Sequence, residues 1–512
     1  MAEAYNAASD LIGRNLAAGR GDKTAFIDDR GAVTYGGLAI LVDRAANALR
    51  TLGIEPEQRV MLCMLDTIDF PAVFLGAIKA GLVPVPVNTL LTAADYEFML
   101  SDSRARALVV SDALYDRIAP ALPRQPHLRH VVVAGGAGRS GALQLSALLD
   151  AAETSAVPAP TTRDDACFWL YSSGSTGAPK GAVHLQSHLV LTAEHYAKPV
   201  LGIAESDVVF SVAKLFFAYG LGNSLTFPMA VGATSVLLAE RPTPAIVARI
   251  LKEHRPTIFY GVPTFYAAML SSPDLPARGE TALRRCVSAG EALPEEIGRR
   301  WSERFGVEIL DGLGSTEMLH IFLSNRPGAV RYGTSGVPCP GYEIKLLDEE
   351  GKPVAPGEIG ELHVAGPTSA AMYWGNRERS QGTFLGHWTR SGDKYVCDAD
   401  GYYTYCGRAD DMLKVGGIWV APFEVEAALM THDGVLEAAV VGHFDEHRLV
   451  KPRAFIVLKP GVAPSQALAE ELQTHVKSRL APYKYPRWVE FVPELPKTAT
   501  GKIQRFKLRE SG

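Results

Sequence analysis

Short strand-type runs alternate with helix-type runs through the first 340 residues, and this alternation limits the possible folds more than any other feature. Apolar runs of strand length are followed by stretches with helical periodicity. The predicted strands cover residues 59–65, 83–87, 107–111, 131–134, 208–212, 234–239, 257–260, 285–288 and 307–310. Helices are predicted at residues 70–80, 93–100, 243–253 and 294–305. Such alternation predicts an α/β fold of layered subdomains with mostly parallel sheets.

The pattern changes near residue 340. Strands at 343–347, 361–365 and 402–406, separated by turn-rich segments, predict an antiparallel β subdomain. A unit of about 100 residues follows, in which helices are predicted at 422–430 and 464–480 and strands at 436–441 and 453–458. We therefore predict a large N-terminal domain over residues 1–409 and a small α+β C-terminal domain over residues 410–512. The Ala-, Gly-, Pro- and Ser-rich residues 134–161 are predicted to be a surface connection.

The composition excludes several classes of protein. Of 512 residues, 47% are hydrophobic and 21% are charged, which argues against a disordered chain. The net charge of −5 argues against a general nucleic-acid binder. Residues 70–87 are too interrupted by proline and lysine to cross a membrane, and the N-terminus lacks the apolar core of a secretory signal. None of the six cysteines forms a C-x-x-C pair. These features predict a cytoplasmic protein with reduced thiols.

The most informative segment is the apolar run 167–171, followed by a loop of small, hydroxylated and glycine residues that ends in a lysine. Such a loop lets backbone N–H groups, hydroxyls and a positive charge surround phosphate oxygens. It differs from the Walker A loop because Pro179 stands at the second glycine position and Gly181 follows the lysine. A merely flexible Gly/Ser loop is the alternative. The predicted phosphate-binding residues are Ser172, Ser173, Gly174, Ser175, Thr176, Gly177 and Lys180.

This loop, residues 171–181 (YSSGSTGAPKG), resembles the signature of the adenylate-forming superfamily of acyl- and aryl-CoA synthetases, luciferases and adenylation domains. Five further segments resemble motifs of the superfamily and follow in the expected order. They are residues 288–292 (SAGEA), 311–317 (DGLGSTE), 389–393 (TRSGD), 407–414 (GRADDMLK) and 496–502 (PKTATGK). Leu313 and Gly314 depart slightly from the superfamily pattern. The resemblance extends over essentially the whole chain.

The resemblance implies that ATP and Mg²⁺ activate a carboxylate as an acyl adenylate, which then reacts with coenzyme A. By resemblance, Thr316 contacts the α-phosphate, Glu317 holds Mg²⁺, and Lys502 is a movable catalytic charge. Asp393 is chemically suited to bind the ribose hydroxyls, and Arg408 to reach ribose or phosphate. Taken singly, Glu317, Asp393 and Lys502 would read as ordinary surface or turn residues. The remaining predicted nucleotide-binding residues are Gly290, Glu291, Ala292, Asp311 and Gly312.

The resemblance also implies that the C-terminal domain moves between the two half-reactions. Asp410 is expected to be the hinge, where a few residues absorb a large φ/ψ change. In the pose for adenylation, Lys502 would lie in the site. In the pose for thioester formation, the region from Lys414 to Gly417 should face the site, and Gly416 and Gly417 would let the pantetheine chain of coenzyme A pass close to the backbone. A simple β-turn is the alternative.

The acid is assigned from residues 213–222 (AKLFFAYGLG) and 318–322 (MLHIF), which resemble the benzoate-CoA ligase branch. Phe217 and Tyr219 have flat rings suited to an aromatic acid. The expected acid-binding residues are Phe217, Ala218, Tyr219, Gly314, Leu319, His320, Ile321 and Lys414. His320 would instead favour 4-hydroxybenzoate or 2-aminobenzoate if it bound a ring substituent. Loading of a carrier protein and a non-catalytic adenylate sensor are further alternatives.

His184 and His188 are four residues apart, as two helical metal ligands would be, but no third ligand stands at a recognisable spacing. We therefore predict a packing role for both histidines. The expected partners of the protein are an aromatic acid, ATP and coenzyme A, with no nucleic acid and no membrane insertion. The expected oligomeric state is a monomer or a homodimer.

Overall fold

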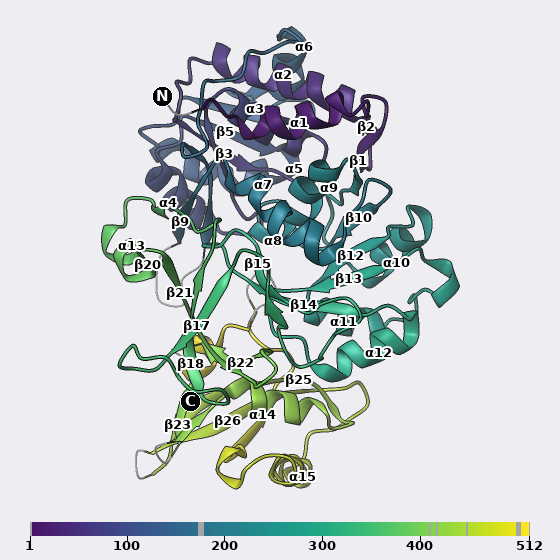
Figure 1. The fold of residues 1–512 in the computed structure, drawn as a ribbon, viewed down its shortest axis with the longest axis vertical. Coiled ribbons are helices and arrows are strands. Elements are labelled where there is room, and N and C mark those ends of the chain that lie inside the picture. Colours follow the sequence, from purple (N-terminus) through teal and green to yellow (C-terminus); the bar gives the residue numbers. More distant parts are fainter. Residues whose placement is uncertain are drawn as a thin grey trace.

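The computed structural model describes residues 3–172, 179–408, 411–415, 418–446, 449–497 and 503–510. Its first sheet, purple to blue in Figure 1, has five parallel strands in the order β4-β3-β5-β6-β7. The strands are β3 (Arg59–Cys63), β4 (Val83–Pro86), β5 (Ala107–Ser111), β6 (His130–Ala134) and β7 (Leu143–Gln144). The helices around them are α1 (Ala7–Ala17), α2 (Tyr35–Thr51), α3 (Asp69–Lys79), α4 (Ala93–Ser103), α5 (Asp112–Ile118) and α6 (Leu145–Ala151), with a 3₁₀ turn at Ala119–Arg124.

The buried strand β3 shows why both faces of this sheet are covered. Successive side chains of a strand point to opposite faces. Val60 and Leu62 belong to the apolar cluster that contains α2 and α3, whereas Met61 and Cys63 belong to the cluster that contains α4. A continuous apolar run is therefore needed, because parallel sheets bury both faces.

The second sheet has nine strands in the order β16-β15-β14-β13-β12-β10-β11-β1-β2. The run from β14 to β1 is parallel, and antiparallel strands complete both edges. The strands are β1 (Thr24–Asp28), β2 (Gly31–Thr34), β10 (Val208–Ser211), β11 (Thr234–Val236), β12 (Ile258–Gly261), β13 (Arg285–Ser288), β14 (Ile309–Gly314), β15 (Ile321–Ser324) and β16 (Val337–Pro338). Its helices are α7 (His188–Thr192), α8 (Ala218–Leu221), α9 (Phe227–Val231), α10 (Pro244–Glu253), α11 (Pro263–Leu270) and α12 (Glu295–Phe305). Two π-helical turns, Ala193–Leu201 and Gly222–Thr226, extend α7 and α8, and a 3₁₀ turn covers Arg278–Glu280.

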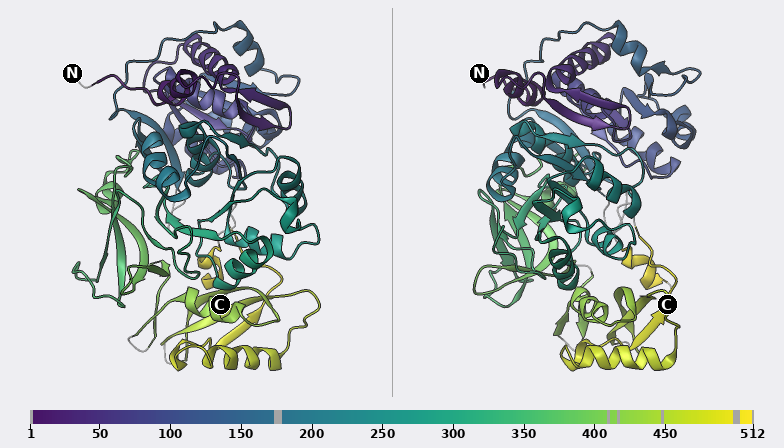
Figure 2. Two further views of the ribbon diagram at one scale, coloured as in Figure 1. Left: turned by 45° about the vertical axis from the view of Figure 1, so that its right-hand side comes forward. Right: turned by 90° about the vertical axis from the view of Figure 1, so that its right-hand side faces the viewer.

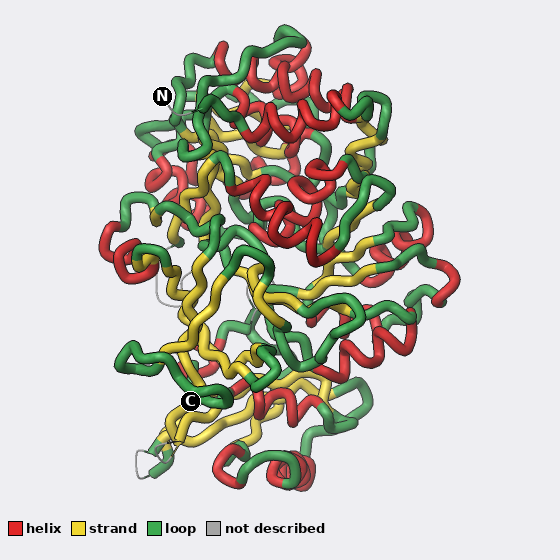
Figure 3. The backbone as a smooth tube through the Cα atoms, in the orientation of Figure 1, coloured by secondary structure: helices red, strands yellow, loops and turns green. Residues whose placement is uncertain are grey.

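A small antiparallel sheet in the order β19-β9-β8 packs with the first sheet, since Trp169 and Val183 share an apolar cluster with β3, β4 and β5. It comprises β8 (Ala166–Ser172), β9 (Lys180–Leu185) and β19 (Met372–Tyr373). A β subdomain follows in the chain and is entirely antiparallel. Its elements are β17 (Glu343–Leu347), β18 (Ile359–Ala365), α13 (Arg377–Thr383), β20 (Phe384–Leu385), β21 (Trp388–Cys397) and β22 (Tyr403–Arg408). In Figure 3, red helices flank the two parallel sheets, whereas the yellow strands of the β subdomain have few helices beside them.

The C-terminal part, yellow-green in Figures 1 and 2, lies at one end of the molecule, below the β subdomain in these views. Its own core forms around α14 and a three-stranded sheet in the order β25-β26-β27. Its elements are β23 (Leu413–Val415), β24 (Ile418–Val420), α14 (Pro422–Met430), β25 (Val435–Phe444), β26 (Val450–Leu458), α15 (Gln466–Lys477), a 3₁₀ turn (Pro482–Lys484), β27 (Trp488–Phe491) and α16 (Arg505–Glu510).

The predicted α/β class is confirmed, with an antiparallel β subdomain at the predicted place. The predicted surface connection 134–161 is wrong in its first half, because β7 and α6 lie there and bury Leu145 and Leu149. Only the second half runs over the surface, where Asn47 Nδ2 donates to the carbonyls of Glu153 and Ser155. Across the described parts of the chain, every helix is too short or too polar to span a bilayer.

Candidate active site

The predicted phosphate loop joins two neighbouring antiparallel strands. Ser172 ends β8, Lys180 begins β9, and the two residues are register partners in the ladder. The loop is therefore followed by a strand, whereas a Walker A loop leads into a helix. The predicted loop residues Ser173, Gly174, Ser175, Thr176 and Gly177 lie outside the described residues.

Four polar side chains, from three strands and the turn between β14 and β15, form one cluster beside this loop. The hydroxyl of Tyr373 donates to Glu317 Oε1 at 2.7 Å, and Ser172 Oγ donates to the same oxygen at 3.3 Å. Lys180 Nζ donates to the Tyr373 hydroxyl at 3.3 Å. Burial lowers the pKa of Lys180, and the nearby Glu317 carboxylate partly opposes this shift. Three of the four residues were predicted as site residues, and the structure brings those three together.

Glu317 is suited to a divalent cation. Both hydrogen bonds to its carboxylate are accepted by Oε1, so among the described residues no donor lies on Oε2. Carboxylate oxygens are the ligands that Mg²⁺ prefers in proteins. Glu317 therefore suits Mg²⁺ as a single protein ligand, and the described part of the chain holds no cluster of three or more His, Cys, Asp or Glu side chains placed to bind a metal.

Two buried histidines, His184 and His188, hold the backbone of Thr316 in place. His184 Nε2 lies 2.8 Å from the carbonyl oxygen of Thr316 and must donate to it, because a carbonyl only accepts. The Nδ1 atoms of His184 and His188 are 3.1 Å apart. The two histidines therefore do more than fill space, which was the role that the sequence predicted. The hydrogen bond from His184 to the carbonyl of Thr316 fixes the segment that carries Thr316 and Glu317.

These two histidines and His320 should make the fold sensitive to acid. Burial lowers the pKa of His184 to about 4 and that of His188 and His320 to about 3. The folded chain keeps them neutral, whereas the unfolded chain protonates them below pH 6.5. Unfolding therefore takes up protons, and stability present above pH 6.5 is lost as the pH falls toward 4. We expect each histidine to lower the free energy of unfolding by about 1 kcal/mol at pH 5.5.

Urea unfolding of the wild type at pH 7.5 and pH 5.5 measures this loss. His188→Gln should lose less stability between the two pH values than the wild type does. The exposed His387, replaced in the same way, is the control and should leave the loss unchanged. A wild type with equal stability at both pH values would refute the assignment.

The predicted adenine-side residues lie at the ends of two neighbouring parallel strands. Gly290, Glu291 and Ala292 follow β13, and Asp311 lies on β14 with Ser288 as its register partner. Asp311 is 3% exposed, and burial raises its pKa. The N–H of Leu293 donates to Asp311 Oδ2 at 3.4 Å, whereas Oδ1 is buried without a partner among the described residues.

An unpartnered buried oxygen is costly unless a ligand donates to it. Asp311 Oδ1 therefore suits an amino group such as that of adenine. Gly312, the next residue, has no room for a side chain, because a Cβ there would lie 2.8 Å from the carbonyl oxygen of Leu323.

The predicted ribose-binding pair lies on the β subdomain. Asp393 on β21 and Arg408 at the end of β22 are register partners, and Arg408 Nη1 donates to Asp393 Oδ1 at 3.3 Å. The carboxylate is thereby oriented on a rigid antiparallel ladder.

Tyr219 lies at the start of the short helical region after Phe217. Its hydroxyl donates to the carbonyl oxygens of Gly261 (3.1 Å) and Val287 (3.2 Å), at the ends of β12 and β13. Burial raises the pKa of this hydroxyl far above its usual value. The ring is therefore fixed by its polar end, and a substrate can use only its apolar surface.

His320 is also more constrained than the sequence suggested. It is 3% exposed, its Nε2 lies 3.2 Å from Asn223 Oδ1, and its ring centroid lies 4.5 Å from that of Phe227 and 5.6 Å from that of Tyr219. Because Asn223 Oδ1 accepts, Nε2 carries the proton. Nδ1 is buried without a partner among the described residues. Asn223 was not predicted, and a lone asparagine after a glycine gives no signal in the sequence.

The other predicted acid-binding residues lie around this ring pair. Gly314 and Ile321 are register partners across the β14–β15 hairpin, whose tight turn places Leu319 in the left-handed region (φ 65°). A Cβ at Gly314 would lie 2.6 Å from the carbonyl oxygen of His320, so only glycine fits there. The ring centroid of Phe217 lies 4.4 Å from that of Phe216, with the two planes tilted by 59°, and Ala218 begins α8.

The remaining predicted residues belong to the C-terminal part. Lys414 lies on β23, opposite Trp419 on β24. The predicted hinge Asp410, the coenzyme A residues Gly416 and Gly417, and the catalytic Lys502 lie outside the described residues.

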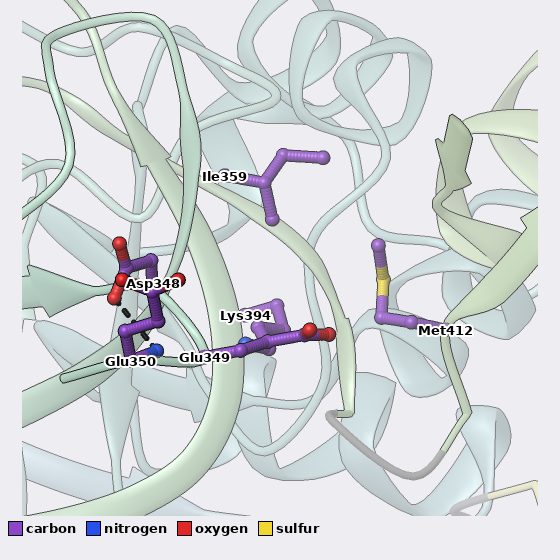
Figure 4. Close-up of a pocket in the computed structure, with 6 residues that line it drawn as sticks. All are labelled: Asp348, Glu349, Glu350, Ile359, Lys394 and Met412. Carbon is purple, nitrogen blue, oxygen red and sulfur yellow. Dashed lines mark hydrogen bonds between the residues drawn. The ribbon is translucent and has the colours of Figure 1, made fainter. Parts of the chain in front are cut away.

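A pocket of about 290 Å³ lies between a turn of the β subdomain and the start of the C-terminal part (Figure 4). Its lining residues are Asp348, Glu349, Glu350, Ile359, Lys394 and Met412. Three carboxylates would repel a carboxylate or nucleotide substrate. None of the predicted site residues lines it, although Lys394 is adjacent to Asp393.

Comparison with known proteins agrees with this arrangement. Residues 14–374 match the AMP-binding enzyme family, and residues 424–502 match the AMP-binding enzyme C-terminal domain. The chain therefore belongs to the family of AMP-binding enzymes. It is 64% identical to the benzoate–CoA ligase of Thauera aromatica, covering 99% of this chain and 96% of the relative.

Two further comparisons bear on the acid. The 4-hydroxybenzoate–CoA/benzoate–CoA ligase of Rhodopseudomonas palustris is 52% identical, covering 99% of this chain and 94% of the relative. The crystal structure of a benzoate CoA ligase from Burkholderia xenovorans is 58% identical with a TM-score of 0.93, covering 99% of this chain and 100% of that chain.

Proposed function

We propose that this enzyme ligates benzoate to coenzyme A in two steps. In the first, a carboxylate oxygen attacks the α-phosphorus of ATP, the bond to pyrophosphate breaks, and benzoyl-AMP forms. In the second, the thiol of coenzyme A attacks the acyl carbon, AMP leaves, and the thiol proton passes to the solvent. The names of the similar proteins given above support the choice of benzoate.

One observation carries the proposal. Glu317 belongs to the polar cluster with Ser172, Lys180 and Tyr373, and His320 belongs to the aromatic cluster with Tyr219 and Phe227. Only two residues separate Glu317 from His320, and the hairpin turn between β14 and β15 fixes both. An aromatic acid whose ring lies against Tyr219 and His320 would therefore place its carboxylate near the phosphates, which are held beside Glu317 and Lys180. Positioning of this kind converts a bimolecular reaction into an intramolecular one.

In the first step, the residues of the chain stabilise negative charge. We assign Lys180 and the phosphate loop to the oxygens of the β- and γ-phosphates, and Thr316 to the α-phosphate. Fixed donors of this kind stabilise charge as it develops in the transition state. Asp393 and Arg408 would hold the ribose, and Asp311 the adenine. Mg²⁺ bound at Glu317 would neutralise phosphate charge.

For the second step, we propose that the C-terminal domain, residues 410–512, rotates about Asp410. Lys502 would serve adenylation in the first pose, and the segment from Lys414 to Gly417 would approach the acyl group in the second. Alternation lets one small site use two sets of groups in turn.

The aromatic cluster supports a small apolar acid. The hydroxyl of Tyr219 and Nε2 of His320 are bound to the protein, so the acid meets mainly the apolar faces of the two rings, and Nδ1 of His320 is left without a partner among the described residues. A hydroxyl or amino group on the ring changes binding in an apolar pocket by only about 1–3 kcal/mol. 4-Hydroxybenzoate and 2-aminobenzoate therefore remain as alternative substrates.

Thioester formation with ATP, Mg²⁺ and coenzyme A tests the proposal. The panel contains benzoate, 4-hydroxybenzoate, 2-aminobenzoate, cyclohexanecarboxylate, acetate and octanoate. We expect the highest kcat/KM for benzoate. Octanoate or acetate as the best substrate would contradict the aromatic pocket while leaving the adenylation chemistry in place.

A further inference from the structure

The hydroxyl of Tyr373 lies between two opposite charges. Lys180 Nζ, 3.3 Å away, can only donate, and Glu317 Oε1, 2.7 Å away, can only accept. The single hydroxyl proton is therefore directed to Glu317, and a lone pair of the same oxygen faces Lys180. Lys180 Nζ also lies 4.4 Å from the centre of the Tyr373 ring.

The surroundings of Tyr373 hold its ring in this place. The residue is 2% exposed and lies on β19, opposite Ala182 on β9, the strand that Lys180 begins. Its N–H donates to Ser380 Oγ at 3.0 Å, and its ring lies 5.1 Å from that of Phe384. The position of the hydroxyl is thus determined by the fold before any ligand binds.

We propose that Tyr373 is a positioning residue that keeps Lys180 and Glu317 from forming a direct ion pair. In a partly buried site, opposite charges attract strongly. A direct pair would occupy the amine and the carboxylate that, under the function proposed above, must bind phosphate and metal. The hydroxyl satisfies both groups with one oxygen and leaves the second carboxylate oxygen for other partners.

The alternative is that Tyr373 matters only for packing. Tyr373→Phe separates the two explanations, because it removes the hydroxyl and keeps the ring. The proposal predicts that Lys180 and Glu317 then pair directly, and that ATP must break this pair to bind. We expect the Kd for ATP, measured by calorimetry with Mg²⁺ and without the acid, to rise about tenfold. The KM for benzoate should not change.

The same substitution in a Lys180→Met background completes the test. Without the lysine no ion pair can form, so Tyr373→Phe should then change the Kd for ATP by less than twofold. Tyr35→Phe is the matched control: it also removes a buried hydroxyl with a hydrogen bond, in this case to the carbonyl of Ala233, away from the site. Its Kd should equal that of the wild type.

Two outcomes would overturn the proposal. One is an unchanged Kd for ATP in Tyr373→Phe, and the other is an equal loss with and without the Lys180 amine. ATP binding is measured without the acid, so it tests Tyr373 even if the acid is not benzoate. A substrate panel that contradicts benzoate can therefore be told apart from ATP-binding data that contradict the role of Tyr373.

Discussion

Lys502→Ala is expected to reduce adenylation about 100- to 1,000-fold, the loss seen when one fixed stabiliser of transition-state charge is removed. The lysine would carry its charge to the carboxylate and the α-phosphate only in the first pose. Conversion of supplied benzoyl-AMP to benzoyl-CoA should therefore stay within about threefold of the wild type. Benzoate-dependent pyrophosphate release measures the first half-reaction, and thioester formation from benzoyl-AMP measures the second.

Contacts in the C-terminal part support this separation. Glu426 accepts hydrogen bonds from Arg505 Nη2 at 2.8 and 2.9 Å, and Asp411 forms ion pairs with Arg505 and Arg509. Arg505 and Arg509 belong to the helix α16, which begins three residues after Lys502. Their ion pairs therefore connect α16 to Asp411, the residue after the proposed hinge. We therefore expect α16 and Asp411 to move as one body.

Lys497→Ala is the matched control, because this lysine belongs to the same segment but pairs with Glu437 at 2.6 Å. It should leave both half-reactions unchanged. Comparable losses in both half-reactions of Lys502→Ala would contradict the alternation of domains.

The second large effect is expected for Glu317→Gln. The amide keeps an oxygen that accepts from Tyr373 but removes the negative charge that suits Mg²⁺. Loss of this ligand should lower the rate of pyrophosphate release at 1 mM Mg²⁺ by about 100-fold or more. The concentration of Mg²⁺ that gives half-maximal rate should rise as well, so that added Mg²⁺ restores part of the activity.

Glu361→Gln serves as the control, since it removes a buried carboxylate that binds Arg390 rather than the proposed metal. Its half-maximal Mg²⁺ concentration should match that of the wild type. If Glu317→Gln gave the wild-type Mg²⁺ dependence, Glu317 would have to be removed from the metal site.

The sequence predicted the layered α/β part well because its strands are buried on both faces and are therefore continuous apolar runs. The strands β3, β5 and β10 were predicted within two residues of their ends. It missed β7 and α6, because a two-residue strand and a seven-residue helix carry too little periodicity among the surrounding small residues. Pairing of β1 with β11 could not be predicted, since more than 200 residues separate the two strands.

The candidate site divides in the same way. Residues such as Glu317, Asp393 and Arg408 were predicted because the segments that contain them resemble motifs of the adenylate-forming superfamily. The contacts of Tyr373, Asn223 and His184 depend on strand pairing and hairpin geometry, so no local pattern indicated them. His320 was predicted in the pocket, but its proton position follows only from the oxygen of Asn223.

The place of the first two strands in the nine-stranded sheet has a consequence for how the chain is made. Residues 24–34 supply the last two strands, and their parallel neighbour is β11 at residues 234–236. The strand β1 is synthesised long before its partner β11 and must wait for it, which makes the contact order high and this part of folding slow. A chain that began after Thr34 would leave β11 as an unpaired edge, open to the strands of other molecules. With the N-terminal hairpin in place, the edge is the four-residue strand β2, and very short edge strands resist pairing with other molecules.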